Sequence, residues 1–509
     1  MAPIKYDNQG DAISRDVPAD GLALIDAGGN GGERQYSYGD LIRASGRVAR
    51  ALKHRGLQRG DRVAILSANR AEYLFAFFGA LQAGFVAVPV NWKLPPEAIR
   101  YVIDDSDARL VLGDNERLPL APANVPKLSF DDELAALLDH DIGDRQASSD
   151  TDAPFHALPM EPDEPAMFLY TSGSTGRPKG VVLSHFSHLW AVSQRVRRPG
   201  PFGHRALVAA PLYHMNGLAM CQTTFSHGDT IVLLPQFTAR SYIEAAARHR
   251  VSQLTSVPTM IAMMLRERAA LAANDLSAVE GVRMGSAPLT QGLIDQVRSV
   301  FPKAQITNGY GTTEAGPVVF GPHPQGLPQP ELSTGYPHSQ VQLRLIRDGR
   351  EVADEGALEM KCGALMTRYH KLPDATARAM TADGYYRTGD VFRRDADGFF
   401  YFVGRVDDMF VCGGENIYPG EVEKMLERHP GIHQAAVLPV PDEIKGHKPV
   451  AFVVRAAGTA LDEQAVKDFA LANAPAYQHP RRVFFIDEMP LAGTNKIDKR
   501  RLASLISDA

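Results

Sequence analysis

A glycine-rich loop between two apolar segments constrains the fold of this chain more than any other feature. Residues 166–170 and 181–183 are apolar, and the eleven residues from Tyr170 to Gly180 read Tyr-Thr-Ser-Gly-Ser-Thr-Gly-Arg-Pro-Lys-Gly. Short apolar runs bounded by Gly and Pro predict buried strands with a loop between them. Glycines let a backbone approach a ligand, and hydroxyls, backbone amides and a lysine attract anionic oxygens, so the stretch predicts a phosphate-binding loop. It is not a Walker A loop, because Pro178 precedes Lys179 and Gly180 follows it.

The composition describes a soluble globular protein that is too long for a single core. The 509 residues predict two or three domains, with 44% hydrophobic and 22% charged residues. The formal charge of −5 argues against a nucleic-acid binder, and residues 1–7 lack the apolar core of a signal peptide. No apolar run reaches the roughly 18 residues of a membrane span, and the three cysteines have neither disulfide nor metal-ligand spacing. We expect a cytoplasmic protein, a monomer or homodimer, without a nucleic-acid partner or an integral membrane segment.

Helical and strand patterns alternate along most of the chain. The expected helices lie at 36–57, 71–83, after Thr290 as N-cap, after Pro419 and at 462–473; the expected strands lie at 62–66, 86–90, 166–170, 181–183, 282–284, 434–439, 450–454 and 483–486. The Pro- and Asp-rich stretch at 118–165 is interpreted as a connection. This alternation predicts parallel sheets covered by helices on both faces.

Seven motifs occur in the order found in one enzyme superfamily. They resemble those of the adenylate-forming superfamily, which comprises acyl-CoA synthetases, adenylation domains of peptide synthetases and firefly luciferase. The segments that carry the resemblance are residues 79–91, 170–180, 210–217, 308–316, 386–390, 404–421 and 490–500. The resemblance implies an α/β fold with a large, multi-subdomain N-terminal AMP-binding domain at 1–403, in which helices sandwich parallel sheets. It also implies a small, mobile α/β lid domain at 404–509, with a hinge near 404–408.

The resemblance assigns most polar motif residues to ATP and Mg²⁺. The implied nucleotide contacts are Thr171, Ser172, Gly173, Ser174, Thr175, Lys179, Ser286, Ala287, Asn308, Gly309, Tyr310, Gly311, Thr313, Asp390, Arg405 and Lys496. Among them Tyr310 would stack on the adenine and Asp390 would accept from the ribose hydroxyls. Glu314 would bind the metal. Thr313 and Lys496 would be catalytic, with Lys496 bridging the reacting carboxylate and the α-phosphate.

The remaining motif residues are implied to serve the acid and coenzyme A. His214 would be a third catalytic residue, at the acyl-binding end, which rearranges between the two steps. The implied lining of the acyl pocket is His214, Met215, Asn216 and Gly309. Gly413 and Gly414 would line the passage for coenzyme A, and the lid would turn about Asp407. Asn495 replaces the glycine usual before the lysine of the last motif, and asparagine is the residue after glycine best able to adopt positive φ.

These motifs predict an ATP-dependent carboxylic acid–CoA ligase, with ATP, Mg²⁺ and coenzyme A as cofactors and co-substrates. A carboxylate would attack the α-phosphate to give acyl-adenylate and pyrophosphate, and a thiol would then attack the adenylate. The alternatives are a stand-alone adenylation enzyme that loads a carrier protein, or luciferase-like oxidation of the adenylate. No carrier domain follows Ala509 and the hinge motif is entire, which favours the ligase. A non-catalytic binding role would need a broken motif.

The pocket residues predict a neutral, apolar acid, either a fatty acid or an aromatic or cyclic one. An α-amino acid would require a carboxylate in the pocket, and a dicarboxylate would require an arginine or lysine. In family members that take malonate, an arginine directly precedes the Tyr-Gly motif, and this chain has Gly309 there.

Overall fold

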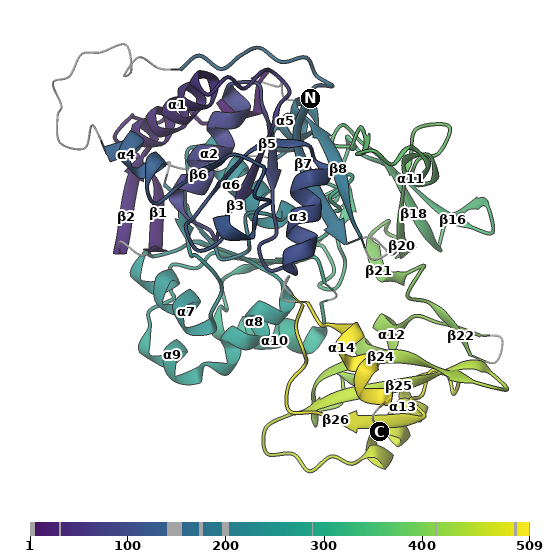
Figure 1. Cartoon of the computed structure of the whole chain (residues 1–509). Coiled ribbons are helices and arrows are strands. Elements are labelled where there is room, and N and C mark those ends of the chain that lie inside the picture. Colours follow the sequence, from purple (N-terminus) through teal and green to yellow (C-terminus); the bar gives the residue numbers. More distant parts are fainter. Residues whose placement is uncertain are drawn as a thin grey trace.

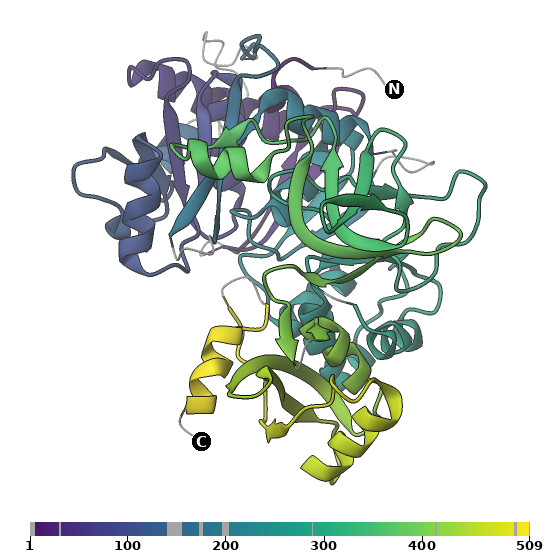
Figure 2. The same ribbon diagram turned by 90° about the vertical axis from the view of Figure 1, so that its right-hand side faces the viewer.

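The computed structural model describes residues 6–29, 32–139, 155–172, 177–195, 203–287, 289–412, 415–492 and 496–507. Within them the chain forms a large body, which ends with β21 (Phe400–Arg405), and a smaller lobe that begins with β22 (Phe410–Cys412). Figures 1 and 2 both show this lobe set against one end of the body. The predicted α/β class, with parallel sheets in a large domain and a smaller C-terminal domain, is confirmed. The boundary at 403/404 and the hinge at Asp407 remain predictions.

The first of two seven-stranded sheets carries the segments at 281–285 and 305–309. Its strand order is β13-β12-β11-β9-β10-β1-β2, and all neighbours are parallel except β1 and β2. The strands are β1 (Leu22–Gly29), β2 (Gly32–Ser37), β9 (Arg205–Val208), β10 (Thr230–Leu233), β11 (Gln253–Ser256), β12 (Gly281–Gly285) and β13 (Gln305–Gly309).

The second seven-stranded sheet carries the phosphate loop predicted from the sequence. Its order is β19-β8-β7-β4-β3-β5-β6, and β8 runs antiparallel to β7 and β19. The strands are β3 (Arg62–Leu66), β4 (Val86–Pro89), β5 (Ala108–Gly113), β6 (Lys127–Ser129), β7 (Pro165–Ser172), β8 (Pro178–Ser184) and β19 (Arg368–Tyr369). The predicted strand–loop–strand unit is therefore the β7–β8 hairpin.

Helices α1 (Tyr38–His54) and α2 (Ala71–Gln82) share one core with the facing sides of both sheets. All twelve residues of α2 are buried, as suits a helix that is apolar on every side. At Gly79 a Cβ atom would lie 2.5 Å from the backbone oxygen of Ser45 in α1, so the absence of a side chain permits this close packing. The motif at 79–91 is therefore scaffold, as its sequence indicates.

Other helices cover the outer faces of the two sheets. Alternate residues of the first sheet pack against α7, α8 and α10, and those of the second against α3. The helices of the body beyond α1 and α2 are α3 (Pro96–Asp105), α4 (Glu133–Asp139), α5 (His185–Ser193), α6 (Met215–His227), α7 (Ala239–Arg248), α8 (Pro258–Arg266), α9 (Arg268–Ala273), α10 (Gln291–Val300) and α11 (Pro373–Ala379), with short 3₁₀ turns at Gln9–Asp11 and Leu118–Leu120. Thr290 caps α10 as predicted. The interpretation of 118–165 as mere connection is wrong, because β6 and α4 lie within it.

A five-stranded antiparallel sheet completes the body and leads into the lid. Its order is β17-β16-β18-β20-β21. The strands are β16 (Gln342–Arg347), β17 (Arg350–Val352), β18 (Glu355–Lys361), β20 (Tyr386–Arg394) and β21, and a separate small ribbon pairs β14 (Phe320–Gly321) with β15 (Tyr336–Pro337). The end of β21 thus brings the chain from the body to the lid.

The smaller lobe is one sheet with helices on both faces. Alternation along β24 places Ala435 and Val437 against α12 and α13, and Ala436 and Leu438 against α14. Its elements are β22, β23 (Glu415–Ile417), α12 (Pro419–Leu426), β24 (Ile432–Asp442), β25 (Gly446–Arg455), α13 (Glu463–Asn473), β26 (Arg482–Phe485) and α14 (Lys499–Ser507). The helices α12 and α13 and the strands β24, β25 and β26 were predicted from the sequence, whereas β22, β23 and α14 were not.

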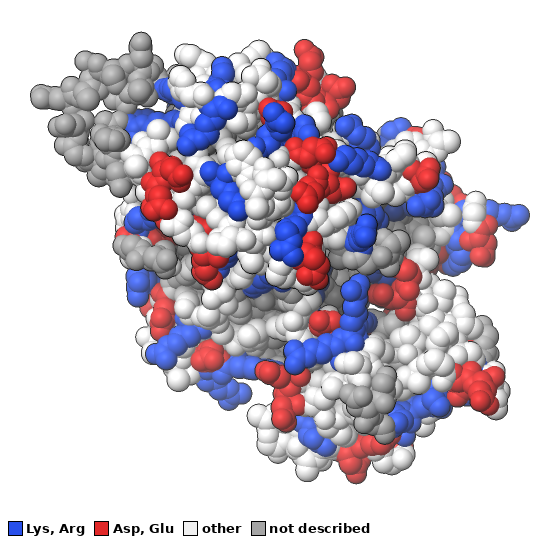
Figure 3. All heavy atoms as spheres, viewed as in Figure 1, with Lys and Arg blue, Asp and Glu red and all other residues white. Residues whose placement is uncertain are grey.

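The surface shows no dominant charge on the face drawn in Figure 3, where acidic and basic side chains are interspersed. Among the residues that the structure describes, no helix is both long enough and apolar enough to cross a membrane.

Candidate active site

Two parallel strands, β12 and β13, bring two predicted nucleotide segments together at their carboxyl ends. Gly285 pairs with Gly309, and a Cβ atom on Gly285 would lie 2.6 Å from the backbone oxygen of Gly309. Loops that leave the carboxyl ends of adjacent parallel strands form the usual ligand crevice of an α/β sheet. Ser286 has φ +65°, in the left-handed region that non-glycine residues seldom adopt and that clusters at functional sites. The predicted segments 285–287 and 308–311 therefore meet at one edge.

The loop after Tyr310 is tightly folded around two glycines. A Cβ atom on Gly311 would lie 2.7 Å from the backbone oxygen of Gly316, which itself has φ +76°. The Thr312 hydroxyl accepts a hydrogen bond from the Ala315 amide at 3.0 Å. This fold fixes the backbone that carries Thr313, for whose side chain the predicted phosphate contact remains a prediction.

Glu314 and Lys179 both contact Tyr369. The carboxylate of Glu314 accepts a hydrogen bond from the Tyr369 hydroxyl at 2.8 Å, and Lys179 Nζ lies 4.6 Å from the centre of the Tyr369 ring. Residues from three distant segments thus converge where the phosphates and the metal were predicted.

Asp390, the predicted ribose ligand, contacts both Tyr310 and Arg405. The antiparallel register of β20 and β21 sets Asp390 opposite Arg405, whose Nη1 donates to Asp390 at 3.1 Å. The Tyr310 hydroxyl donates to the other carboxylate oxygen at 2.5 Å. Burial raises the pKa of Asp390, while Tyr310 and Arg405 oppose that rise. The carboxylate is therefore fixed by two donors beside the aromatic ring predicted to meet adenine.

Lys496 of the smaller lobe lies close enough to this group to feel the charges of Asp390 and Arg405. Lys496 is partly exposed to solvent. Desolvation by the surrounding protein lowers the pKa of its amine, and the negative charge of Asp390 opposes this effect. The charge of Lys496 in turn helps to lower the pKa of His214. The charges of Asp390 and Lys496 thus influence one another, and Lys496 also influences His214.

His214 precedes the first turn of α6 and carries an unsatisfied nitrogen. Its Nε2 is buried without a hydrogen-bond partner among the described residues, and its ring lies edge-on to Tyr213 with centroids 4.7 Å apart. Burial lowers the pKa of His214 to about 4, so the imidazole is neutral at physiological pH. A neutral ring with a free nitrogen fits the predicted role of a group that rearranges. Met215 follows it and packs against the main core.

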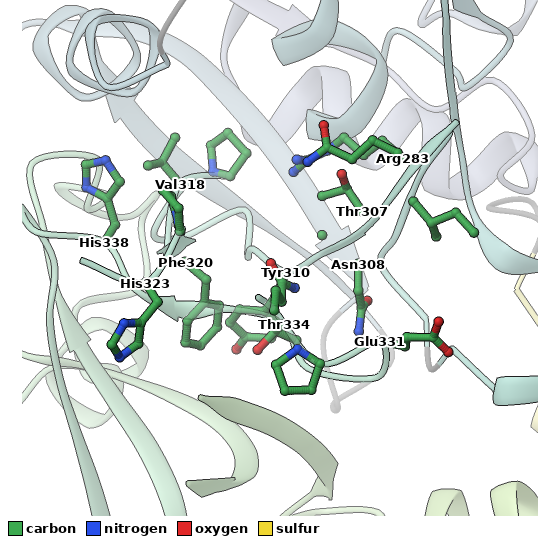
Figure 4. Close-up of a pocket in the computed structure, with 18 of the residues that line it drawn as sticks. Arg283, Thr307, Asn308, Tyr310, Val318, Phe320, His323, Glu331, Thr334 and His338 are labelled. Carbon is green, nitrogen blue, oxygen red and sulfur yellow. The ribbon is translucent and has the colours of Figure 1, made fainter. Parts of the chain in front are cut away.

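A cavity of about 760 Å³ runs along β13 up to Gly309 and Tyr310. Its apolar walls include Ile294, Pro317, Val318 and Phe320. Figure 4 shows Val318 and His338 across the cavity from Arg283 and Thr307. Of the four residues predicted to line the acyl pocket, Gly309 lines this cavity, whereas His214, Met215 and Asn216 lie outside its lining.

Three arginines line the cavity, Arg195, Arg283 and Arg298, and none was predicted from the sequence. Arg283 lies on β12 between Val282 and Met284, both of which are buried in the core. Because side chains alternate along a strand, an arginine flanked by two core residues must point to the opposite face, and this signal was readable. Arg195 follows α5, where no periodicity singles it out, and its Nη1 donates to Thr223 Oγ1 at 3.0 Å.

Several predicted residues lie outside the described part of the chain or are only partly described. Gly173, Ser174, Thr175, Gly413 and Gly414 fall in the undescribed ranges. The backbone of Ser172 pairs with Pro178, and that of Thr171 with Lys179, at the base of the loop. Asp407 lies between β21 and β22, and its carboxylate accepts from Arg405 Nε at 3.1 Å. Their functional roles remain predictions.

The donor set fits a magnesium ion held mainly by substrate. Among the described residues there is no group of three or more His, Cys, Asp or Glu that could enclose a metal. Mg²⁺ is commonly held by one or two carboxylates together with substrate phosphates and water. Glu314, with one oxygen committed to Tyr369, could supply one such ligand.

Comparison with known proteins identifies the family. Residues 13–370 match the AMP-binding enzyme family, and residues 421–496 match the AMP-binding enzyme C-terminal domain. The chain therefore belongs to the AMP-binding enzymes of the adenylate-forming superfamily, as the resemblance of its motifs indicated.

Relatives of known name cover nearly the whole chain. It is 34% identical over 485 residues to the fatty acid–[acyl-carrier-protein] ligase ScoC of Streptomyces coeruleorubidus, with 92% of this chain and 91% of the relative covered. It is 34% identical over 478 residues to a feruloyl-CoA synthase of Amycolatopsis sp, with 92% and 93% covered. Among solved structures it is similar to ATP-bound MatB from Rhodopseudomonas palustris, with a TM-score of 0.84, 27% identity and 99% of each chain covered.

Proposed function

We propose that this chain is an AMP-forming carboxylic acid–CoA ligase. The observation that carries the proposal is Asp390, which Tyr310 holds at 2.5 Å and Arg405 holds at 3.1 Å, beside a cavity that Tyr310 also lines. A cavity large enough for a small acid ends beside the same group, at Gly309 and Tyr310. The feruloyl-CoA synthase among its relatives supports coenzyme A as the acceptor.

In the first half-reaction the protein would act by position and charge. Tyr310 would face the adenine, while Asp390, held by Arg405, would accept from the ribose hydroxyls. Lys179 would hold the outer phosphates. A metal ion bound at Glu314 would neutralise phosphate charge. As the acid's carboxylate attacks the α-phosphate, Lys496 would stabilise the charge that develops there, and pyrophosphate would leave.

In the second half-reaction the lid would move. If a thiol approaches from the side of the adenylate on which Lys496 acts, Lys496 would have to withdraw before coenzyme A could enter. The exposed segment around Asp407, between β21 and β22, is the proposed pivot. Gly413 and Gly414 follow directly in the chain and are the proposed lining of the thiol passage. Such gating by a lid is common in enzymes with two chemical steps.

A carrier protein is a second candidate acceptor. The specific observation in its favour is the similarity to a fatty acid–[acyl-carrier-protein] ligase, which is as high as that to the CoA synthase. Both acceptors present a thiol to the same adenylate, so the first half-reaction does not distinguish them.

The acid predicted from the sequence was neutral and apolar. The walls formed by Ile294, Pro317, Val318 and Phe320 support an acid with a compact apolar body. The argument for neutrality rested on the absence of a cation near Gly309, and this premise is wrong. A Cβ atom on Gly309 would lie 2.9 Å from Arg283 Nη2, so a guanidinium occupies that space.

A two-stage assay tests the proposal. Purified enzyme with Mg-ATP and a panel of short, aromatic and long-chain acids should release pyrophosphate for some acids. Thioester should then form when free coenzyme A is added. Pyrophosphate release with thioester formation only on a phosphopantetheinyl carrier protein would favour the second candidate. Absence of both products with every acid would overturn the proposed function.

A further inference from the structure

Two cationic side chains face the cavity without a counter-charge. Arg283 has no ion pair with any described residue, and Arg195 donates only to the neutral Thr223 hydroxyl. The third arginine of the cavity, Arg298, differs, because its Nη2 lies 2.5 Å from Glu331 Oε1. The unpaired charges are thus confined to one part of the cavity wall.

The strand that carries Arg283 fixes its direction. Val282 and Met284 are fully buried in the core behind β12, so Arg283 projects from the opposite face into the cavity. The guanidinium lies against the bare backbone of Gly309, with Nη2, Cζ and Nε all within 3.2 Å of where a Cβ atom would be. The glycine therefore makes room for the arginine. This cation reaches the acyl end from β12 rather than from position 309 itself.

The electrostatics favour an anion at this place. Burial lowers the pKa of Arg283, and burial followed by the charge of Arg283 lowers the pKa of Arg195. Neither cause includes an acidic group. A guanidinium keeps its proton in proteins, so both charges persist and repel each other. Both side chains are partly shielded from water, and a shielded charge without a partner is unfavourable unless a ligand supplies one.

We propose that the acid substrate carries a second anionic group, which Arg283 and Arg195 bind where they line the cavity. The inference rests on the proposed function and narrows its substrate to dicarboxylic or sulfo-carboxylic acids with a compact apolar middle. A planar guanidinium matches both carboxylate and sulfonate oxygens by paired hydrogen bonds. Val318 and Phe320 would contact the carbon body between the two charged ends.

Matched acid pairs test this assignment. The panel contains the linear dicarboxylates from malonate to suberate and terephthalate, each with its monoamide, together with sulfo-carboxylates of equal length. Pyrophosphate release and thioester formation are measured separately. The charged member of at least one pair should exceed its monoamide by about tenfold or more in kcat/KM, the scale of one charge-assisted hydrogen bond. The sulfo-carboxylates show which anionic head the site prefers.

Substitution of the two arginines provides the sharper test. Arg283→Met should lower kcat/KM for the charged acid and raise it for the monoamide, because the uncompensated charge is removed. A folding defect cannot produce such a crossing. Arg195→Met should act in the same direction, and Arg283→Lys should retain part of the preference. Arg240→Gln is the matched control and should keep the wild-type ratio, because Arg240 lies outside the cavity and pairs with Glu244 on the surface of α7. The KM for ATP should be unchanged in Arg283→Met.

Two results would overturn the assignment. One is a wild-type enzyme whose kcat/KM for monoamides, phenolic acids or fatty acids equals that for the dianions. The other is an Arg283→Met variant that loses activity by the same factor with both members of a pair. If no acid yields any product, the proposed function fails, and melting temperature still decides the binding question. The dianions should then stabilise the wild type but not Arg283→Met, and equal shifts would reject the site.

Discussion

The nucleotide end and the acyl end of this site differ in how their charges are compensated. At the nucleotide end Asp390 is held by Tyr310 and Arg405, and Glu314 is held by Tyr369. At the acyl end Arg195 and Arg283 form no ion pair with any residue that the structure describes, and Arg195 donates to the Thr223 hydroxyl. Groups that fix one another before a ligand arrives form a preorganised site, whereas an unpaired charge leaves the counter-charge to the ligand. The nucleotide end should therefore serve every acid alike, and the acyl end should choose among them.

The largest effect is expected from removing Lys496, which would act on the α-phosphate whatever the acid. Lys496→Ala should slow adenylation by about 10²-fold or more, the scale of one preorganised donor, and by equal factors for all acids. Thioester formation from synthetic acyl-adenylate should change much less. Single-turnover measurement of each step decides. Lys499→Ala is the control, since that lysine pairs with Glu423 on the lid at 3.0 Å. Equal losses in both steps would remove the catalytic assignment.

The buried carboxylate of the ribose site should come next. Asp390→Asn keeps the shape but loses the charge that Arg405 and Tyr310 hold, so the KM for ATP should rise by roughly 10- to 100-fold. The same factor is expected with a dicarboxylate and with its monoamide. Asp383→Asn is the control, because Asp383 pairs with Arg344 on the surface. A loss that depends on the acid would break the separation of the two ends.

A smaller shift is expected at the metal. Glu314→Gln should raise the Mg²⁺ concentration required for half-maximal pyrophosphate release by roughly tenfold. Losses of metal affinity of about this size follow the mutation of supporting groups in other metal sites. Tyr369→Phe, which keeps the carboxylate and removes only its donor, should shift it less. Chelation of Mg²⁺ should stop adenylation but leave transfer from synthetic acyl-adenylate intact. An unchanged Mg²⁺ titration in Glu314→Gln would assign the carboxylate a structural role alone.

The pH dependence follows from the lowered pKa of Lys496. Adenylation needs the protonated amine, and desolvation makes that proton easier to lose. The rate of adenylation should therefore fall as pH rises through a pKa below that of a free lysine. The rate of thiol transfer from synthetic acyl-adenylate should not fall over this range. Lys496→Arg should be slower but flat over the same range, because a guanidinium keeps its charge. If the adenylation rate of Lys496→Arg falls at high pH as the wild-type rate does, a group other than Lys496 causes the fall.

The sequence predicted the nucleotide end better than the acyl end for a physical reason. Loops such as 310–316 need glycine where the backbone crowds or φ is positive, so their function leaves a contiguous pattern in the sequence. The acyl cavity is instead assembled from single side chains on separate elements. Arg195 and Arg283 are far apart in the chain, and only the parallel register of β12 and β13 sets Arg283 beside Gly309.

The same contrast holds for the fold. Strand β3 and helix α2 were predicted almost to the residue, because a fully apolar run between turn signals leaves few alternatives. The short elements β6 and α4 were missed, since pairing of β6 with β5 rather than local pattern defines the strand. The position of the lid against the body was likewise beyond sequence pattern, and with it the proximity of Lys496 to Asp390.

The smallest predicted effect concerns Gly309, the residue that joins the two ends. It is the last residue of β13 and follows Asn308 of the predicted nucleotide motif. The guanidinium of Arg283 lies against its Cα. Its φ lies outside the left-handed region, so alanine fits the backbone, and the new methyl would press only on the end of a flexible side chain. Gly309→Ala should therefore displace Arg283 without removing it.

The expected loss in kcat/KM for the preferred dianion is roughly two- to tenfold, the scale of one weakened hydrogen bond, with the KM for ATP unchanged. Gly292→Ala on α10, where a Cβ atom meets nothing within 4 Å, controls for the substitution itself. If ATP binding weakens together with the acid, β13 transmits strain between the ends, and they do not act independently. If only the kcat/KM for the dianion falls, the missing side chain at Gly309 is needed to position Arg283. A residue inside the predicted nucleotide motif would then contribute to acid specificity.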